Sequence, residues 1–295
     1  MNFFPNISRA IALLILVYVI QAVIFIPAAA LGPAMASAFM ENPLTIAVFN
    51  TVSIGSVLLI GLRRTGAPFR EVFPFTPISL SLLLPMALTV IGMSIILSEG
   101  NNYVLKFLPI PPQIAKVFQD VFGTPEKFWG TLLTAVIVAP LTEELLFRGL
   151  VLRGFLRNYS VRKAIIVSAL LFGVFHILPW QIPGAAILGA IFAWWFVQTR
   201  SLLPCLFGHA LNNGLTLIPL IVPQLKIPGY FNESPDQVVF QPLWFDLLGL
   251  LLAGTGMWWL YHEFMKMDAE RSRESSAVSS ADPVFSDNGR MKNQQ

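Results

Sequence analysis

The sequence contains few charged residues. Only 12% of its 295 residues are Asp, Glu, Lys or Arg, whereas soluble domains average about 25%. Ten of the 35 charges fall in the last thirty residues, which leaves 25 for the other 265. The chain is 55% hydrophobic, with a mean hydropathy of +0.69. This composition excludes a soluble enzyme, a disordered chain and a collagen, and it indicates a multi-pass integral membrane protein.

Cysteine is almost absent, since Cys205 is the only one. A single cysteine forms no internal disulfide and gives no support for a cysteine-based zinc knuckle. The net charge is +3, but the sequence has no basic stripe interleaved with aromatic residues, so we expect no nucleic-acid partner. In a membrane protein, basic residues instead mark cytoplasmic loops. The partner that the composition predicts is the lipid bilayer.

Long hydrophobic runs, by contrast, are abundant. A membrane-spanning helix needs about 20 mostly apolar residues. The first hydrophobic run, residues 11–31, is longer than the apolar region of a signal peptide, so we expect it to be a retained membrane helix. We predict an all-α fold, a polytopic bundle of about eight transmembrane helices. The fifth and sixth are short and separated by Pro179 and Pro183, so we expect a tight or partly re-entrant pair. The eight candidates are residues 11–31, 44–62, 78–97, 128–152, 163–178, 184–197, 202–220 and 242–261.

The basic residues are distributed unequally between the two sides of these spans. Fourteen fall on one side and four on the other, and Arg148 lies within a span. Because cytoplasmic loops carry the excess of Lys and Arg, we predict that both termini are cytoplasmic. The four on the other side are Lys106, Lys116, Lys127 and Lys226.

Two segments lie outside the spans. Residues 111–122 place apolar side chains on one helical face and polar ones on the other, which predicts an interfacial amphipathic helix. Residues 266–295 are rich in Ser and charge, which predicts a disordered cytoplasmic tail. We therefore divide the chain into residues 1–127 (three spans and the interfacial helix), 128–220 (the helical core with the polar motifs), 221–265 (a loop and the last span) and 266–295.

Polar residues inside the predicted spans are the clearest functional signal. An intramembrane ionisable residue is costly and usually functional. The fourth span contains Glu143, Glu144 and Arg148, the fifth contains His176, and the seventh contains His209 followed by Asn212 and Asn213. Two of the three histidines and the only adjacent acidic pair therefore lie in predicted membrane helices.

The spacing in the fourth span assigns provisional roles to its charges. Glu144 and Arg148 are four residues apart, in the order that favours an ion pair on one helical face. Glu143 points about 100° away and has no cation on its own helix. A carboxylate in an apolar pocket is suited to act as a general base. The alternative for Glu144 and Arg148 is a purely structural ion pair.

His209 and Asn213 are also four residues apart, so both can present N–H donors to one point. Two donors in a low-dielectric cleft can stabilise a developing oxyanion. Asn212 is the alternative amide, although the spacing favours Asn213. His176 is placed to share a water molecule with Glu143. The alternative for either histidine is a hydrogen bond that links two membrane helices.

Taken together, Glu-Glu-x-x-x-Arg, Phe-x-x-x-His and His-x-x-x-Asn occur in order between residues 128 and 220. This pattern resembles the intramembrane CAAX-protease and bacteriocin-processing (CPBP or ABI) family, which includes the type 2 CAAX prenyl endopeptidase. The resemblance implies an eight-helix membrane endopeptidase of a bacterial or archaeal type of cell membrane. It also implies that the partner is a membrane-associated peptide or protein substrate, of the prenylated CAAX type or of a bacteriocin or signal type.

The resemblance implies a role for each motif residue. Glu143 would activate water, His176 would help to hold it, and His209 with Asn213 would form the oxyanion hole, while Glu144 and Arg148 support the site. We expect no cofactor, because the sequence lacks His-Glu-x-x-His and Asn213 is a poor zinc ligand. If a metal such as zinc is bound, its ligands would be Glu143, His176 and His209.

A second hypothesis comes from a different class of protein. A non-catalytic membrane protein, such as a transporter, an immunity factor or a scaffold, can also contain buried polar residues that bind an ion or link helices. Transporters often show inverted repeats and broken helices, and the Pro179–Pro183 break is the one such feature that we find in the sequence.

Overall fold

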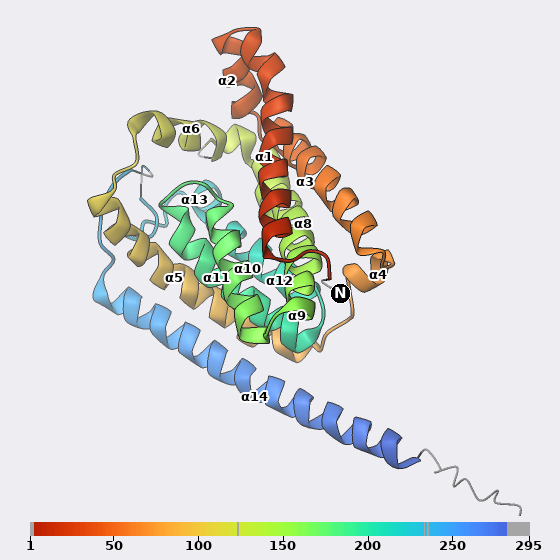
Figure 1. Cartoon of the computed structure of the whole chain (residues 1–295). Helices are drawn as coiled ribbons and strands as arrows, with labels where there is room; N and C mark the ends of the chain where they lie inside the picture. The colour runs from red at the N-terminus through yellow and green to blue at the C-terminus, as the bar shows by residue number, and fades with distance from the viewer. Residues whose placement is uncertain (1–2, 123, 233, 235, 282–295) are drawn as a thin grey trace, which may run out of the picture.

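The fold is entirely helical, as the sequence predicts. The computed structural model describes residues 3–122, 124–232, 234 and 236–281 (Figure 1). It is 80% helical, and these residues contain no strand. The helices are α1 (Ile7–Ala30), α2 (Pro33–Glu41), α3 (Pro43–Thr65), α4 (Phe69–Val72), η1 (Leu80–Leu82), α5 (Leu83–Phe107), α6 (Pro112–Phe122), η2 (Pro125–Lys127), α7 (Phe128–Leu132), η3 (Leu133–Val138), α8 (Ala139–Glu144), η4 (Leu145–Leu152), α9 (Arg153–Asn158), α10 (Val161–Val174), α11 (Gln181–Thr199), α12 (Leu203–Leu215), α13 (Ile218–Ile221) and α14 (Leu243–Ala281).

Within the described ranges, five helices are long and apolar enough to cross a membrane. They correspond to the first, second, third, sixth and eighth predicted spans. The other three predicted spans correspond to the run from α7 to α9, to α10 and to α12, of which α10 has 14 residues and α12 has 13. The total of eight crossings stays a prediction. The five crossing helices are Ile7–Ala30, Pro43–Thr65, Leu80–Phe107, Gln181–Thr199 and Leu243–Glu274.

Small residues allow α5 and α14 to pack closely side by side (Figure 1). A Cβ atom added to Gly92 of α5 would lie 2.2 Å from the backbone nitrogen of Ala253 in α14, and one added to Gly256 would lie 2.6 Å from the carbonyl oxygen of Pro85. Such distances leave no room for a side chain. Helices in membranes associate through this kind of close backbone approach, because lipid offers little hydrophobic driving force.

The run from α7 to α9 contains two π-helical stretches, η3 and η4, on either side of α8. In a π-helix, each carbonyl accepts a hydrogen bond from the N–H five residues later. For the carbonyl of Ala135 that residue is Pro140 in α8, which has no backbone N–H, so this bond is missing. Glu143 and Glu144 end α8 immediately before the second stretch. Single π-helical turns often occur at functional sites, and here they border the acidic pair.

The predicted short pair is confirmed as two closely packed helices, α10 and α11, with a short connection. A Cβ atom on Gly173 would lie 2.7 Å from the carbonyl oxygen of Ile182. The end of the fifth predicted span is wrong, because α10 ends at Val174 rather than at residue 178. His176 therefore lies in the turn after the helix. The cause is the backbone of Ile177, whose φ of 60° is left-handed and cannot continue a right-handed helix.

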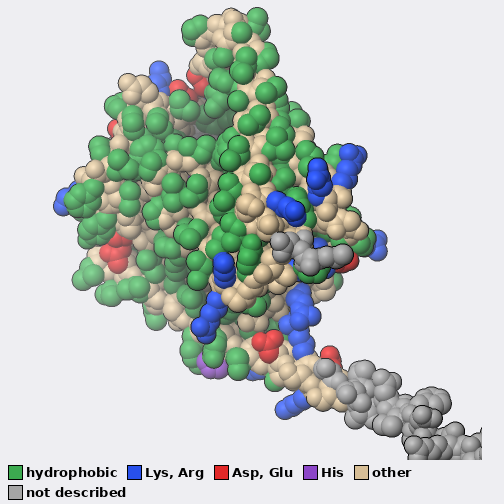
Figure 2. Space-filling view, in the orientation of Figure 1, with side chains coloured by type: hydrophobic (Ala, Val, Ile, Leu, Met, Phe, Trp, Pro, Cys, Tyr) green, Lys and Arg blue, Asp and Glu red, His purple; other side chains and the backbone are tan. Residues whose placement is uncertain are grey.

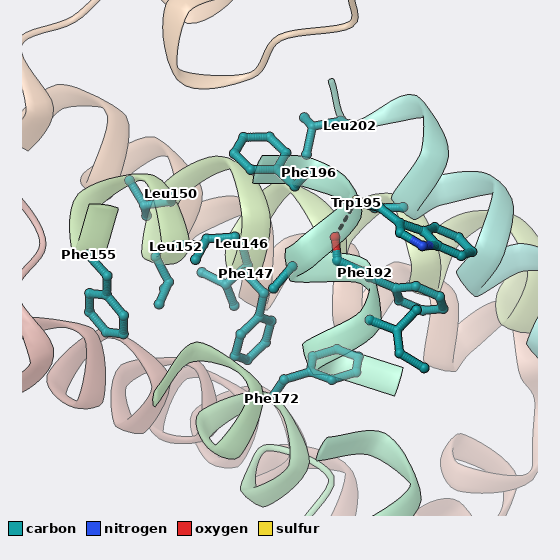
Figure 3. Close-up of a cluster of buried hydrophobic side chains, with 14 of the residues drawn as sticks. Leu146, Phe147, Leu150, Leu152, Phe155, Phe172, Phe192, Trp195, Phe196 and Leu202 are labelled. Atoms are coloured by element: carbon teal, nitrogen blue, oxygen red, sulfur yellow. Dashed lines mark hydrogen bonds between the residues drawn. The ribbon is translucent and has the colours of Figure 1, made fainter. Parts of the chain in front are cut away.

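Large apolar side chains fill the interior of the bundle. Four of these side chains are almost completely buried: Phe147, Phe155, Phe192 and Trp195. Figure 3 shows them together in one cluster from η4, α9 and α11. The face of the molecule in Figure 2 is also largely apolar, as the predominance of green shows. An apolar exterior of this extent is suited to lipid contact. It agrees with a polytopic membrane protein.

Several segments that the sequence places on the basic side of the membrane meet in the structure. Asn158 Nδ2 donates to the carbonyl of Phe3 at 2.7 Å, and Arg157 pairs with Glu71 at 2.7 Å. The N-terminus, α4 and the end of α9 are therefore neighbours. Lys and Arg side chains gather at the right and lower edges of the face in Figure 2. Which end faces the cytoplasm stays a prediction, as do the four segments into which we divide the chain.

Two predictions outside the main bundle have different outcomes. Residues 112–122 form α6, so the predicted helix is present. The predicted disorder from residue 266 is wrong for residues 266–281, which continue α14 to Ala281. Met267 still packs against the core, and Lys266 pairs with Glu263 one turn earlier, which favours the helix. Residues 282–295 lie outside the described residues.

Candidate active site

Three buried polar side chains form a continuous hydrogen-bonded chain. Arg148 Nη1 donates to Glu144 Oε1 at 2.9 Å, so the predicted ion pair is present. His209 Nδ1 lies 2.8 Å from the same oxygen. Since an ionised carboxylate only accepts, the ring donates through Nδ1. The chain joins η4, α8 and α12, and all three side chains are buried. The sequence did not predict that Glu144 orients His209.

The Arg148 guanidinium is held by more than its carboxylate. Its Nη2 donates to the carbonyl of Gly189 at 3.1 Å. Its central carbon lies 4.5 Å from the ring centre of Phe172 and 5.5 Å from that of Phe192. These two rings also flank His209, at 5.7 and 6.1 Å, and Figure 3 shows both rings in the core. A buried cation with this many partners holds Glu144 in one position.

Glu143 differs from Glu144 in burial and in partners. The Glu144 side chain is fully buried, whereas the Glu143 side chain is 15% exposed. Glu143 Oε2 is buried and has no hydrogen-bond partner in the part of the chain that the structure describes, and the same holds for Glu144 Oε2. Glu143 Oε2 lies 4.0 Å from His209 Nε2. A buried carboxylate oxygen without a protein partner is costly unless water or a substrate satisfies it.

Asn213 lies one turn after His209 on α12, as its spacing predicts. Its Nδ2 donates to the carbonyl of Ala135 at 2.8 Å, and its Oδ1 accepts from Asn212 Nδ2 at 3.3 Å. The Ala135 carbonyl is the one that Pro140 leaves without its π-helical partner. An amide carries two donor hydrogens. One is used in this bond and the other remains for a ligand.

His176 reaches the region of the site from the turn after α10. Its Nδ1 lies 2.9 Å from the carbonyl of Phe172, which only accepts, so the ring donates through Nδ1, and in the neutral ring Nε2 is then an acceptor. Its ring lies 5.0 Å from that of Phe172. Phe172 therefore contacts both histidines and Arg148.

One neighbouring polar residue was missed by sequence reasoning. Tyr18 of α1 donates its hydroxyl hydrogen to the carbonyl of Phe175, and its side chain lies within electrostatic range of Glu143. A tyrosine in an apolar helix is not ionised at neutral pH and forms no motif with the later residues. Its contact with the site depends on how α1 packs, for which the sequence contains no signal.

The predicted alternative metal ligands do not come together. Within the described ranges, no group of three or more His, Cys, Asp or Glu side chains is placed to hold a metal ion. The Nδ1 bonds of His209 to Glu144 and of His176 to a carbonyl would leave both Nε2 atoms available for a metal. The three side chains are nevertheless not placed as one set of metal ligands in this arrangement. That the protein needs no cofactor stays a prediction.

The fold and the site define an integral membrane protein with a buried polar centre in an otherwise apolar bundle. In a comparison with known families, residues 125–215 match the family described as Type II CAAX prenyl endopeptidase Rce1-like. The chain thus carries an Rce1-like domain, which agrees with the predicted resemblance and indicates a CAAX-type membrane protease, a hydrolase. No curated protein and no solved structure matches the chain.

Proposed function

We propose that this protein is an intramembrane endopeptidase in which Glu143 activates the attacking water. The observation that carries the proposal is the environment of Glu143 Oε2, which is buried, has no hydrogen-bond partner in the described chain, and lies 4.0 Å from His209 Nε2. A water molecule beside this oxygen would satisfy it. Glu143 is also the more accessible of the two acids, so a substrate can approach it.

The proposed reaction starts when Glu143 accepts a proton from the water. The resulting hydroxide attacks the carbonyl carbon of the scissile peptide bond and forms a tetrahedral oxyanion. Glu143 then returns the proton to the peptide nitrogen as the C–N bond breaks, which releases a new carboxylate and a new amine. A carboxylate that accepts and then donates one proton serves as general base and general acid in turn.

The oxyanion needs donors that are fixed before the reaction begins. His209 Nε2 and the second amide hydrogen of Asn213 are the donors that we propose. For this role the His209 ring carries protons on both nitrogens, because Nδ1 already donates to Glu144. Arg148 and Glu144 hold the ring in place through the chain of bonds described above.

His176 has the remaining role in the proposal. Because its Nδ1 donates to Phe172, its Nε2 is free to accept a hydrogen bond from the attacking water. Glu143 and His176 would then hold the water from two elements, α8 and the turn after α10. Two fixed acceptors orient the water lone pair toward the substrate carbonyl.

The substrate that we propose is a membrane-associated peptide with a CAAX-type C-terminus. The family match supports this class, and the buried site in an apolar bundle supports a substrate that is itself anchored in the bilayer. Bacteriocin- or signal-type peptides are the alternative substrates, to be compared with the prenylated CAAX peptide. Both require the scissile bond to lie close to the membrane.

The test uses the full chain, purified and reconstituted into liposomes with a fluorescent CAAX-type peptide that carries a farnesyl anchor. Wild type should release the C-terminal product, identified by mass spectrometry, and Glu143→Gln should not. Glu71→Gln is the matched control, because Glu71 is a half-exposed acid in a surface pair with Arg157. Cleavage by Glu143→Gln at the wild-type rate, or no cleavage of anchored peptides by wild type, would refute the proposal.

A further inference from the structure

Tyr18 connects the N-terminal helix to the turn that carries His176. Its hydroxyl donates to the carbonyl of Phe175, and the two rings pack with their centres 5.3 Å apart. Phe175 directly precedes His176 in the chain. Tyr18 lies on α1, outside the segment 125–215 that matches the family. The contact therefore places a residue from another part of the chain next to the proposed water site.

The turn that contains His176 is not helical, although backbone bonds close it, such as those from His176 N to the carbonyl of Gly173 and from Ile177 N to that of Val174, both at 3.0 Å. α10 ends at Val174, and Ile177 takes a φ of 60°, which is uncommon for a residue branched at Cβ. Backbones of this kind persist only where surrounding contacts hold them, and they occur often at functional sites. On the α1 side, the contact that holds this turn is the hydrogen bond from Tyr18.

The direction of the His176 ring depends on this backbone. His176 Nδ1 donates to the carbonyl of Phe172, which fixes one edge of the ring to the last turn of α10. The position of the His176 Cα atom depends on the backbone of the preceding residue, Phe175. The hydroxyl of Tyr18 donates to the carbonyl of Phe175. Tyr18 thus bonds to the residue directly before His176, one of the two groups that would hold the attacking water.

We infer that Tyr18 is a positioning residue, which fixes the turn after α10 so that His176 Nε2 faces the water on Glu143. This inference rests on the function proposed above. Tyr18 does not touch the scissile bond in this scheme, because its hydroxyl hydrogen is used by Phe175. Its effect should therefore appear in the turnover number and leave substrate binding unchanged.

The experiment compares Tyr18→Phe with wild type in the liposome assay, with each rate referred to the folded fraction measured by size-exclusion chromatography. Phenylalanine keeps the ring that packs on Phe175 and removes only the hydroxyl. We expect kcat to fall about tenfold or more, since small errors in the position of a reacting group are costly, while KM stays within about twofold.

Tyr230→Phe is the matched control. The Tyr230 hydroxyl is 2.9 Å from Ser94 Oγ, so this variant also removes a partly buried tyrosine hydrogen bond, far along the chain from the site. It should keep the wild-type kcat. The inference is overturned if Tyr18→Phe loses less than about tenfold in kcat, if its loss appears in KM instead, or if Tyr230→Phe loses as much. Failure of the proposed function is a separate result: the Glu143→Gln variant would then cleave the peptide at the wild-type rate.

Discussion

His209 Nδ1 lies 2.8 Å from Glu144 Oε1, the same oxygen that accepts the bond from Arg148. The second acid of the pair therefore orients a histidine of α12, while Oε2 of the first acid lies 4.0 Å from Nε2 of the same ring. Because their contacts differ, the two adjacent glutamates have different roles. Glu144 belongs to a buried ion pair through Oε1, and its unpartnered Oε2 is fully enclosed. Glu143 has an unpartnered oxygen on a side chain that is 15% exposed, so a water or a substrate can reach it.

Removal of the Glu144 charge should destabilise the fold. Glu144→Gln leaves the Arg148 cation buried without its anion, and breaking a buried pair in this way costs about 3–5 kcal/mol. Glu71→Gln, which breaks a half-exposed pair, should cost less than about 1 kcal/mol. Unfolding by denaturant in detergent micelles measures both. If Glu144→Gln is as stable as Glu71→Gln, the buried pair has no structural role.

Asn213 and Asn212 can be told apart by their effect on catalysis. Asn213→Ala should lower kcat by about 10²–10³-fold, the usual effect of losing one oxyanion donor. Asn212→Ala should leave kcat within a few-fold of wild type, because the Asn212 amide donates to Oδ1 of Asn213 and so has a supporting position in this arrangement. A loss of activity in Asn212→Ala alone would assign the oxyanion role to the other amide.

The close packing of α5 and α14 predicts a strong effect at Gly92. A methyl group there would overlap the backbone of Ala253, so Gly92→Ala should destabilise the protein by about 1–3 kcal/mol. Gly100→Ala lies on the same helix, where an added Cβ meets nothing within 4 Å. It should be neutral or stabilise by about 0.5–1 kcal/mol. Equal unfolding midpoints for the two variants would show that the helices do not pack this closely.

Metal removal should not abolish cleavage. Glu143, His176 and His209 are not placed as a set of metal ligands, and the proposed chemistry needs only a carboxylate and fixed donors. Protein washed with a chelator, then freed of it, should cleave the anchored peptide at the untreated rate. Metal analysis of the same sample is the control. Stoichiometric zinc in active protein, together with activity that returns only when zinc is added, would contradict this expectation.

Local spacing was enough to predict some of the site. Glu144 and Arg148 are on one helix, so their separation by four residues determines their contact, and the pair is present. The bond between His209 and Glu144 joins two helices, and it depends on packing that spacing does not describe. The same holds for Tyr18, whose partner is 157 residues away in the chain.

Two errors in the predicted boundaries have identifiable physical causes. The fifth span was extended through His176 because its residues are apolar, yet Ile177 turns the backbone into a left-handed conformation that hydropathy does not reveal. The segment after residue 266 was predicted to be disordered from its composition. Its charges form pairs at helical spacing, such as Arg271 with Asp268, and α14 continues through them.

The central claim is that Glu143 is the general base, and one comparison tests it most directly. Glu143→Gln and wild type are reconstituted at equal folded amounts, and single-turnover cleavage of a farnesylated peptide is followed by mass spectrometry together with the unfolding midpoint. The account predicts that Glu143→Gln unfolds like wild type and cleaves at least about 10²-fold more slowly. Wild-type cleavage by a fully folded Glu143→Gln would contradict it.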